Sequence, residues 1–169
     1  MSATVSPGQL AIYTALTTFI KGLIDCELVQ GLGNNVSTPV NPFIAMTAVA
    51  QNRIATNIET YDGVSVRHVQ QSVEYAVQID CYGPDASDWA MVLSTMLRDP
   101  YGCTVLGPDV QPLYAEDPRM LPVIDAEALF EARWMVNAML QFNPIVTVPQ
   151  DYADVLNLEL VSVDATFKP

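Results

Sequence analysis

The stretch FEARWMVNAMLQFNPIVTVPQ, Phe130–Gln150, decides how this chain is expected to fold. Its first half is rich in residues that favour helices, such as Glu, Ala, Arg, Met and Leu. Its periodicity is nevertheless that of a strand. Every even-numbered residue from 130 to 142 is apolar, and the odd-numbered residues between them are polar except for Met135 and Met139. A two-residue period kept over this length predicts a long, half-buried strand at about 128–143. Pro144 and Pro149 confine its end to a sheet edge or to a departure from the sheet.

Two helices are predicted from helical spacing of apolar residues. Ser6 and Pro7 suit the N-cap and first turn of a helix over roughly 8–24. A second helix is expected at about 84–98, where Asp85 and Asp88 favour its start and Pro100 follows its end. The expected apolar faces are Ile12, Leu16, Phe19, Ile20 and Leu23 in the first helix, and Trp89, Val92, Leu93, Met96 and Leu97 in the second.

The remaining segments indicate further strands. A short strand is expected in CELVQ, a second at 43–56, and an alternating run up to residue 82, with a bend near His68. Together, 43–82 predicts a long antiparallel hairpin with an exposed tip. Prolines between 99 and 125 predict a loop with one short strand near 110–114, and a helical turn and a last strand are expected after residue 150. The sequence thus predicts one α+β domain, 1–169, with an antiparallel or mixed sheet and two main helices packed on one face.

The composition restricts the partners of such a domain. At 169 residues, half of them apolar, the chain can form an ordered core. Nineteen acidic and seven basic residues give a formal charge of −12, which argues against holding nucleic acid through its phosphates. An acidic surface that nucleic acid passes without binding remains compatible with this charge, as does a merely solvated face. No segment is apolar enough for a membrane span, and the N-terminus lacks the basic region of an export signal.

Little in the sequence points to catalysis. Cys26, Cys81 and Cys103 form no CxxC pair and are expected to be reduced thiols, while the single histidine, His68, is too few for a zinc site. GLGN resembles a phosphate loop only superficially and is better explained as a turn. We therefore predict no catalytic, cofactor-binding or metal site and no cofactor. A cation held by Asp80, Asp85, Asp88 and Asp99 is the weaker alternative.

Met135 and Met139 lie on the mixed face of the predicted long strand. Methionine adapts to irregular neighbours and is common at interfaces. The two side chains therefore indicate either a contact with another subunit or a second layer from the same chain. Long exposed strands also favour an oligomer, because their edges need partners.

Three stretches carry a resemblance to a known family. Asp80-Cys81-Tyr82-Gly83-Pro84, the run Tyr114–Arg119 (YAEDPR) and Gln141-Phe142-Asn143-Pro144 occur in an order that resembles the neck or tail terminator proteins of contractile-tailed bacteriophages, over residues 7–164. The resemblance implies an α+β structural protein of the virion, assembled in the host cytoplasm. It also implies a homohexameric ring that caps the tail tube, contacts tube and sheath proteins, and joins the tail to the head connector proteins. The phage DNA would cross the lumen without specific binding.

Within this interpretation, the long strand would build the ring, and the hairpin tip between Arg53 and Arg67 would contact the tail tube or the connector. Arg53, Arg67, Met135 and Met139 are thus the candidate interface residues. Three alternatives remain: a connector stopper or completion protein, a non-virion acidic assembly adaptor, and a carboxylate–metal enzyme. The acids that face a lumen cannot be identified from one chain.

Overall fold

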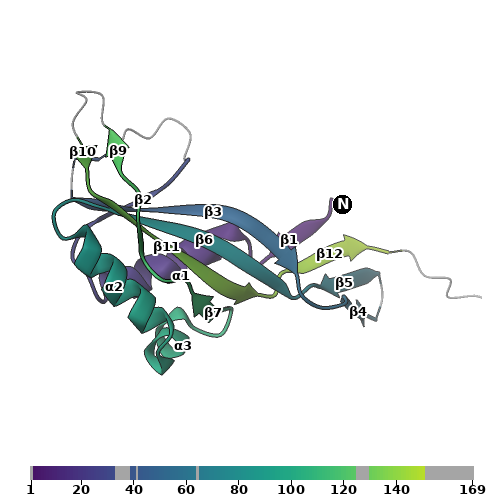
Figure 1. The fold of residues 1–169 in the computed structure, drawn as a ribbon. Helices are drawn as coiled ribbons and strands as arrows, with labels where there is room; N and C mark the ends of the chain where they lie inside the picture. The colour runs from purple at the N-terminus through teal and green to yellow at the C-terminus, as the bar shows by residue number, and fades with distance from the viewer. Residues whose placement is uncertain (1, 33–38, 41, 64, 125–129, 151–169) are drawn as a thin grey trace, which may run out of the picture.

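Three long strands, each with one short interruption, run through the whole molecule (Figure 1). The computed structural model describes residues 2–32, 39–40, 42–63, 65–124 and 130–150. Within these, β3 (Phe43–Arg53) is followed by β4 (Ile58–Asp62), β5 (Val66–Gln70) by β6 (Val73–Tyr82), and β11 (Arg133–Phe142) by β12 (Ile145–Pro149). The fold is α+β, as predicted.

The main sheet has the strand order β2-β3-β6-β11-β7, and β8 also pairs with β11. Its shorter strands are β2 (Glu27–Gln30), β7 (Val110–Ala115) and β8 (Arg119–Met120). β2 runs parallel to β3, and the other pairs are antiparallel. A separate small hairpin joins β9 (Val123–Ile124) to β10 (Phe130–Glu131).

Three helices cover one face of the main sheet: α1 (Gln9–Lys21), α2 (Ala86–Leu97) and α3 (Pro100–Leu106) (Figure 1). Their buried side chains and those of the central strands form one hydrophobic cluster. Alternate residues of each central strand point into it, as expected for a sheet covered on one side. The fully buried members include Ile12, Leu16, Phe19, Ile20, Ile44, Val77, Ile79, Leu93, Val136 and Leu140.

The prediction for the long strand is confirmed. Val136, Ala138, Leu140 and Phe142 are buried, while the odd-numbered residues from 133 to 141 are half-buried. The strand is shorter than expected at its start, because Ala132 interrupts it between β10 and β11. Tertiary pairing with β6 along its whole length therefore overrides the helical propensity of the segment.

The first helix is confirmed, but its predicted N-cap is wrong. Ser6 ends strand β1 (Thr4–Ser6), which pairs with β12, and Gly8 is the N-cap without a side-chain hydrogen bond. The backbone of Ser6 thus pairs with Ile145 in a sheet and does not cap the helix. Gly22 ends the helix, as expected.

The second helix is also confirmed, with a different buried face. Ala86, Ala90, Leu93, Ser94 and Leu97 are buried, whereas Val92 is 38% exposed, so its predicted place in the core is wrong. Trp89 and Met96 pack only partly against the core. The small side chains of Ala86 and Ala90 allow the helix to lie close to the sheet, which turns the larger residues toward its flanks.

The loop predicted for 99–125 contains a third helix, α3, which we did not predict. Pro100 occupies the first turn of this helix, where its missing N–H has no cost, and Asp99 caps it by accepting a hydrogen bond from the Tyr101 N–H at 2.9 Å. The predicted short strand is confirmed as β7.

The hairpin prediction for 43–82 is confirmed with an interruption. β3 pairs with β6, and β4 with β5, but the pairing breaks at 54–57 and at Gln71–Ser72, a few residues beyond His68. The outer part joins β12 and β1 in a second sheet of order β1-β12-β5-β4, here called the arm. The arm extends beyond the helices (Figure 1). The helical turn and strand expected after residue 150 lie outside the described residues.

Candidate assembly surfaces

The arm is a single layer, and none of its strands contains a buried residue. All residues of β1 and β4 are exposed, those of β5 are half-buried, and those of β12 are half-buried except for exposed Pro149. A sheet normally buries one face against another element, so an uncovered sheet of this size is unusual. The arm is therefore the first candidate for an assembly surface.

The two faces of the arm differ in character. Residues that pair directly share a face, so the register assigns the side chains. One face, here called the valine face, carries Val5, Tyr61, Val69, Val146 and Val148, together with Glu59 and Arg67. The other face is mixed: polar Thr4, Ser6, Thr60, Asp62, His68, Gln70 and Thr147 lie there beside apolar Ile58, Val66, Ile145 and Pro149. The valine face is thus an apolar strip with one ion pair on it.

That ion pair neutralises Arg67 locally. The Arg67 Nη2 atom lies 2.5 Å from Glu59 Oε1, and the Tyr61 hydroxyl donates to Glu59 Oε2 at 3.1 Å. Both charged side chains are more than a third exposed. An exposed pair of this kind contributes about 0–1 kcal/mol to stability, so it orders the surface more than it stabilises the fold.

The structure separates the two arginines predicted for the hairpin tip. Arg53 ends β3, opposite Val73, and its Nε donates to the carbonyl of Ala55 at 2.9 Å. Arg67 lies in β5, which at about 3.3 Å per residue places it roughly 20 Å farther along the ribbon. Arg53 therefore marks the base of the arm and Arg67 its outer half, and their contact with a partner stays a prediction.

Met135 and Met139 lie on the face of the main sheet opposite the helices, here called the open face. Both are half-buried residues of β11. Met135 pairs with Asp80 on one side and Arg119 on the other, and Met139 with Ala76 and Tyr114. The two methionines are thus small apolar areas within a polar surface, and their role at an interface stays a prediction.

A buried ion pair anchors the open face, and no local sequence pattern indicates it. Asp80 is only 4% exposed. Arg133 reaches Asp80 Oδ1 with Nε and Nη2, both at 3.0 Å, and the Gln78 side-chain amide donates to Oδ2 at 2.7 Å. The guanidinium carbon of Arg133 lies 5.8 Å from the Tyr82 ring centroid. Cross-strand register brings these residues together, and register cannot be derived from local periodicity.

Arg98 holds two residues of the stretch Tyr114–Arg119, Ala115 and Asp117, through its guanidinium group. From the C-cap of α2, its guanidinium donates to the Ala115 carbonyl from Nε at 2.9 Å and from Nη2 at 2.6 Å. Nη2 also lies 2.7 Å from Asp117 Oδ1. The sequence suggested only a helix end at Arg98. Its side chain instead ties the end of α2 to the loop after β7.

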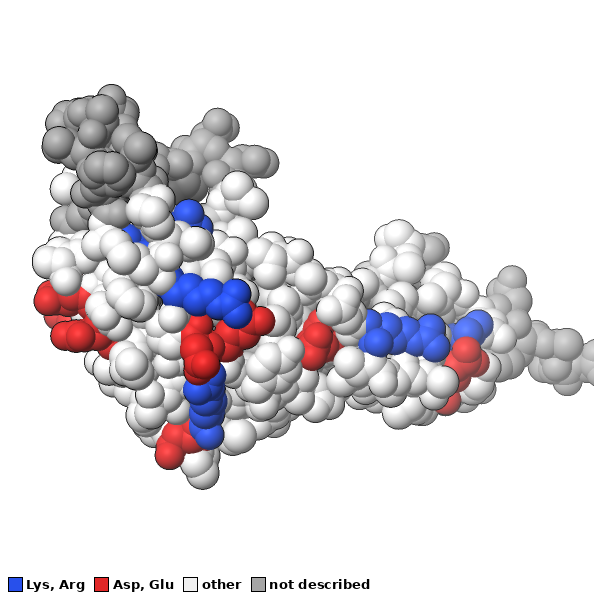
Figure 2. Space-filling view, viewed as in Figure 1, with Lys and Arg blue, Asp and Glu red and all other residues white. Residues whose placement is uncertain are grey.

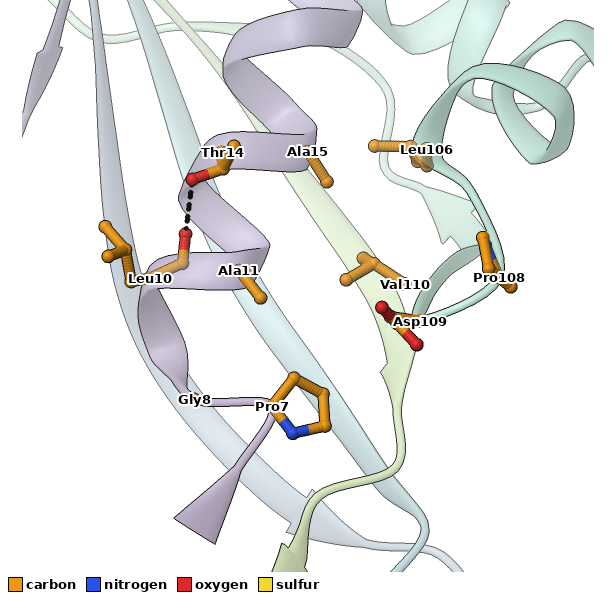
Figure 3. A pocket seen from close by; sticks show the side chains of 10 residues that line it. All are labelled: Pro7, Gly8, Leu10, Ala11, Thr14, Ala15, Leu106, Pro108, Asp109 and Val110. Atoms are coloured by element: carbon orange, nitrogen blue, oxygen red, sulfur yellow. Dashed lines mark hydrogen bonds between the residues drawn. The ribbon is translucent and has the colours of Figure 1, made fainter.

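A groove of about 540 Å³ lies between the start of α1 and the α3–β7 connection (Figure 3). Ala11 and Ala15 of α1 face Leu106 and Val110 across it. The Thr14 hydroxyl donates to the Leu10 carbonyl at 2.9 Å, so it is occupied within its own helix. Asp109 is the one charged residue of the lining. The groove offers apolar contact and no catalytic arrangement.

The four acids considered for a cation site lie on three different elements. Asp80 is on the open face, Asp85 and Asp99 are the N-caps of α2 and α3, and Asp88 is in the first turn of α2. No group of three or more His, Cys, Asp or Glu suited to a metal occurs in the part of the chain that the structure describes. Burial, with smaller effects of Cys26 and Asp80, raises the pKa of the Cys81 thiol to about 12.

Charges alternate in sign on the face seen in Figure 2, where basic and acidic side chains adjoin on both the arm and the helix-covered part. This face has no continuous basic patch of the kind that holds nucleic acid. Among the described residues, no helix is long and apolar enough to cross a membrane.

Comparison with known proteins identifies the family. The sequence model of the phage neck terminator protein family matches residues 10–168, which is nearly the whole chain. A search of curated proteins finds no significant match. The family match agrees with the resemblance carried by the three stretches above, and its members are structural components of the virion. The chain therefore belongs to the phage neck terminator protein family.

Proposed function

We propose that this protein forms a homohexameric ring in the neck of a contractile-tailed phage. The ring caps the tail tube, contacts the tube and sheath proteins, and joins the finished tail to the head connector proteins. It assembles in the host cytoplasm, and the phage genome passes through its lumen. The family membership supports the neck role, and the single-layered arm is the structural observation that supports assembly into a ring.

The arm supports assembly because it cannot bury its own apolar surface. The helix-covered part has a core shared by strands and helices, whereas no residue of the arm strands is buried. Exposed sheet edges and apolar strips usually mark places where another chain binds. Neighbouring subunits would cover the arm in the ring.

The net charge supports passage of the genome without binding. A formal charge of −12 disfavours contacts with phosphates, because such contacts require lysine or arginine. On the arm, Arg67 is neutralised by Glu59. DNA that moves through the lumen would therefore meet a surface that does not retain it.

Electron microscopy of the phage neck tests this proposal. We expect a sixfold ring of this protein between the tail tube and the connector, and a mass close to that of a hexamer for the assembled species in light scattering. A layer of another symmetry on the connector side would favour the stopper interpretation. Absence of the protein from mature particles would instead favour the assembly adaptor.

The role of the arm in joining can be tested by charge reversal. Arg53→Glu/Arg67→Glu should leave the subunit folded, because Arg53 is exposed and the half-buried Arg67 lies in the arm, outside the hydrophobic core, and should block the joining of heads to tails in an in vitro complementation assay. Lys21→Glu is the matched control, since Lys21 is an exposed cation at the end of α1, away from the arm. Normal joining by the double variant would exclude the arm as the joining surface.

A further inference from the structure

Among the residues that the structure describes, the arm has two edges without a partner strand. In the order β1-β12-β5-β4, the terminal strands β1 and β4 each pair with a described strand on one side only. They lie on opposite sides of the arm (Figure 1). An edge strand presents backbone N–H and C=O groups that can pair with a strand of another chain. β4 contains no proline and no lysine, which commonly protect such edges, and carries only the acids Glu59 and Asp62.

We infer that β1 of one subunit pairs with β4 of the next subunit, so that neighbouring arms form one continuous antiparallel sheet. This inference rests on the proposed ring and specifies the surfaces that join its subunits. Because the two edges are different, the contact is head-to-tail. Repetition of a head-to-tail contact gives a ring when the rotation between neighbours closes, as the proposed hexamer requires, whereas a contact between identical edges would stop at a dimer.

The strand directions fit this arrangement. β1 is antiparallel to β12, β12 to β5, and β5 to β4. β1 and β4 therefore run in opposite directions within one arm. When the next copy is placed beside β4 in the same orientation, its β1 continues the alternation, and no strand has to reverse.

Charge favours the pairing of β4 with β1 of the next subunit over the pairing of β4 with a second β4. Two β4 strands side by side would add the charges of two acidic strands along one edge, with Asp62 of both copies contributing directly and Glu59 partly offset by its ion pair with Arg67. Like charges across neighbouring strands are destabilising. β1 consists of Thr4, Val5 and Ser6, which carry no charge and two hydroxyl groups. An acidic strand next to a strand with hydroxyl donors is the complementary combination.

Side-chain chemistry also selects a register. If Val5 lies opposite Tyr61 of the neighbour, Thr4 lies opposite Asp62 and Ser6 opposite Thr60. A β-branched residue then pairs with an aromatic one, which stabilises antiparallel sheets, and the Thr4 hydroxyl can donate to the Asp62 carboxylate. Val5 and Tyr61 both belong to the valine face, so this register extends the apolar strip across the subunit boundary.

Other registers are less favourable. A shift by two residues places Val5 either opposite the carboxylate of Glu59 or opposite Gly63, beyond the end of β4. A shift by one residue moves every β1 side chain to the opposite face and interrupts the valine face. The arm therefore specifies both the partner strand and its alignment.

Disulfide trapping in assembled particles tests the pairing. The variant Val5→Cys/Tyr61→Cys, in a Cys103→Ser background, replaces two exposed side chains and removes the exposed native thiol. Directly opposite residues on antiparallel strands bring their Cβ atoms close enough for a disulfide after a small adjustment. Mild oxidation of phage that carry this variant should give a ladder of covalent oligomers up to the full ring on a non-reducing gel. Reductant should abolish the ladder.

The controls distinguish cross-linking in the proposed register from cross-linking between cysteines that are merely close together. Each single cysteine variant should give no ladder, and neither should Thr4→Cys/Tyr61→Cys, because Thr4 and Tyr61 lie on opposite faces. Should the first pair prevent particle formation, Ser6→Cys/Thr60→Cys probes the same register on the other face. A neck ring without cross-links in either pair, or with dimers alone, would overturn the inference and leave the proposed function intact. A neck without a ring of this protein would reject the proposed function itself.

Discussion

The helix-covered part of the molecule and the arm are built from the same three long strands, yet they differ in burial. In β11, Val136, Ala138 and Leu140 are fully buried, whereas Val146 and Val148 of β12, which follows directly in the chain, are half-buried. Both segments pair with neighbouring strands on two sides. What differs is the layer of helices, which ends where the arm begins (Figure 1).

The same contrast holds for the ion pairs of the two regions. Arg133–Asp80 crosses the main sheet with side-chain exposures of 23% and 5%, whereas Arg67–Glu59 crosses the arm with 37% and 41%. Position in the structure, more than residue type, thus decides how much a side chain contributes. The side chains of the arm become buried only if other subunits cover them.

The largest expected effect comes from breaking the buried pair. Arg133→Ala leaves the Asp80 carboxylate buried without its cation, which typically costs 3–5 kcal/mol; since Arg133 is partly exposed, we expect a loss of about 3 kcal/mol in the free energy of unfolding. Arg67→Ala, the matched change on the arm, should cost less than about 1 kcal/mol. Denaturant unfolding of both variants measures the difference. Equal losses would show that the two regions are not distinct in this respect.

A second comparison makes the same substitution, Val to Ala, in β11 and in β12, which follow each other in the chain. Val136→Ala removes two buried methyl groups and should cost about 2 kcal/mol from transfer and cavity terms. Val146→Ala on the valine face should cost less than about 1 kcal/mol in the isolated subunit, because Val146 is half-buried there.

In the assembled ring, substitution of Val146 should affect thermal stability more than it does in the isolated subunit. If neighbouring arms cover the valine face, Val146→Ala should lower the thermal stability of the assembled ring although it barely changes that of the subunit. Thermal unfolding of the subunit and of assembled particles distinguishes the two effects. A ring unaffected by Val146→Ala would indicate that this face stays open after assembly.

Local periodicity was sufficient to predict the main parts of the fold. The alternation from 130 to 142 correctly outweighed helical propensity, because a sheet covered on one side requires a two-residue period. The apolar spacing of α1 predicted Ile12, Leu16, Phe19 and Ile20 of its buried face. It missed Tyr13, and Leu23 lies beyond the end of α1 and is half-buried. The α+β class followed from the order of these elements.

Features that depend on tertiary context could not be predicted in the same way. Pro100 was interpreted as a helix stop but begins α3, and Ser6 suited a helix cap but pairs in β1. The contacts of Arg133 with Asp80 and of Arg98 with Ala115 link segments far apart in the sequence. The interface residues Arg53, Arg67, Met135 and Met139 stay predictions, because interfaces are formed by partners that a single chain does not contain.

The smallest expected effect concerns the pH dependence of the core. Burial raises the pKa of Cys81 from 9.0 to about 12, so the folded protein binds this proton more tightly than the unfolded chain does. The corresponding stability is fully present below pH 9 and is lost as the pH rises from 9 toward 12. At pH 10 the loss is about 1 kcal/mol for this thiol. Cys81→Ala should therefore flatten the decrease in the free energy of unfolding between pH 8.5 and 10, measured with urea. Cys103→Ala should leave this decrease unchanged, because Cys103 is exposed.

A decrease of the same slope in both variants would mean that the buried thiol does not control stability in this range. The alkaline sensitivity would then come from the other groups with raised pKa values, buried Tyr75 and half-buried Cys26.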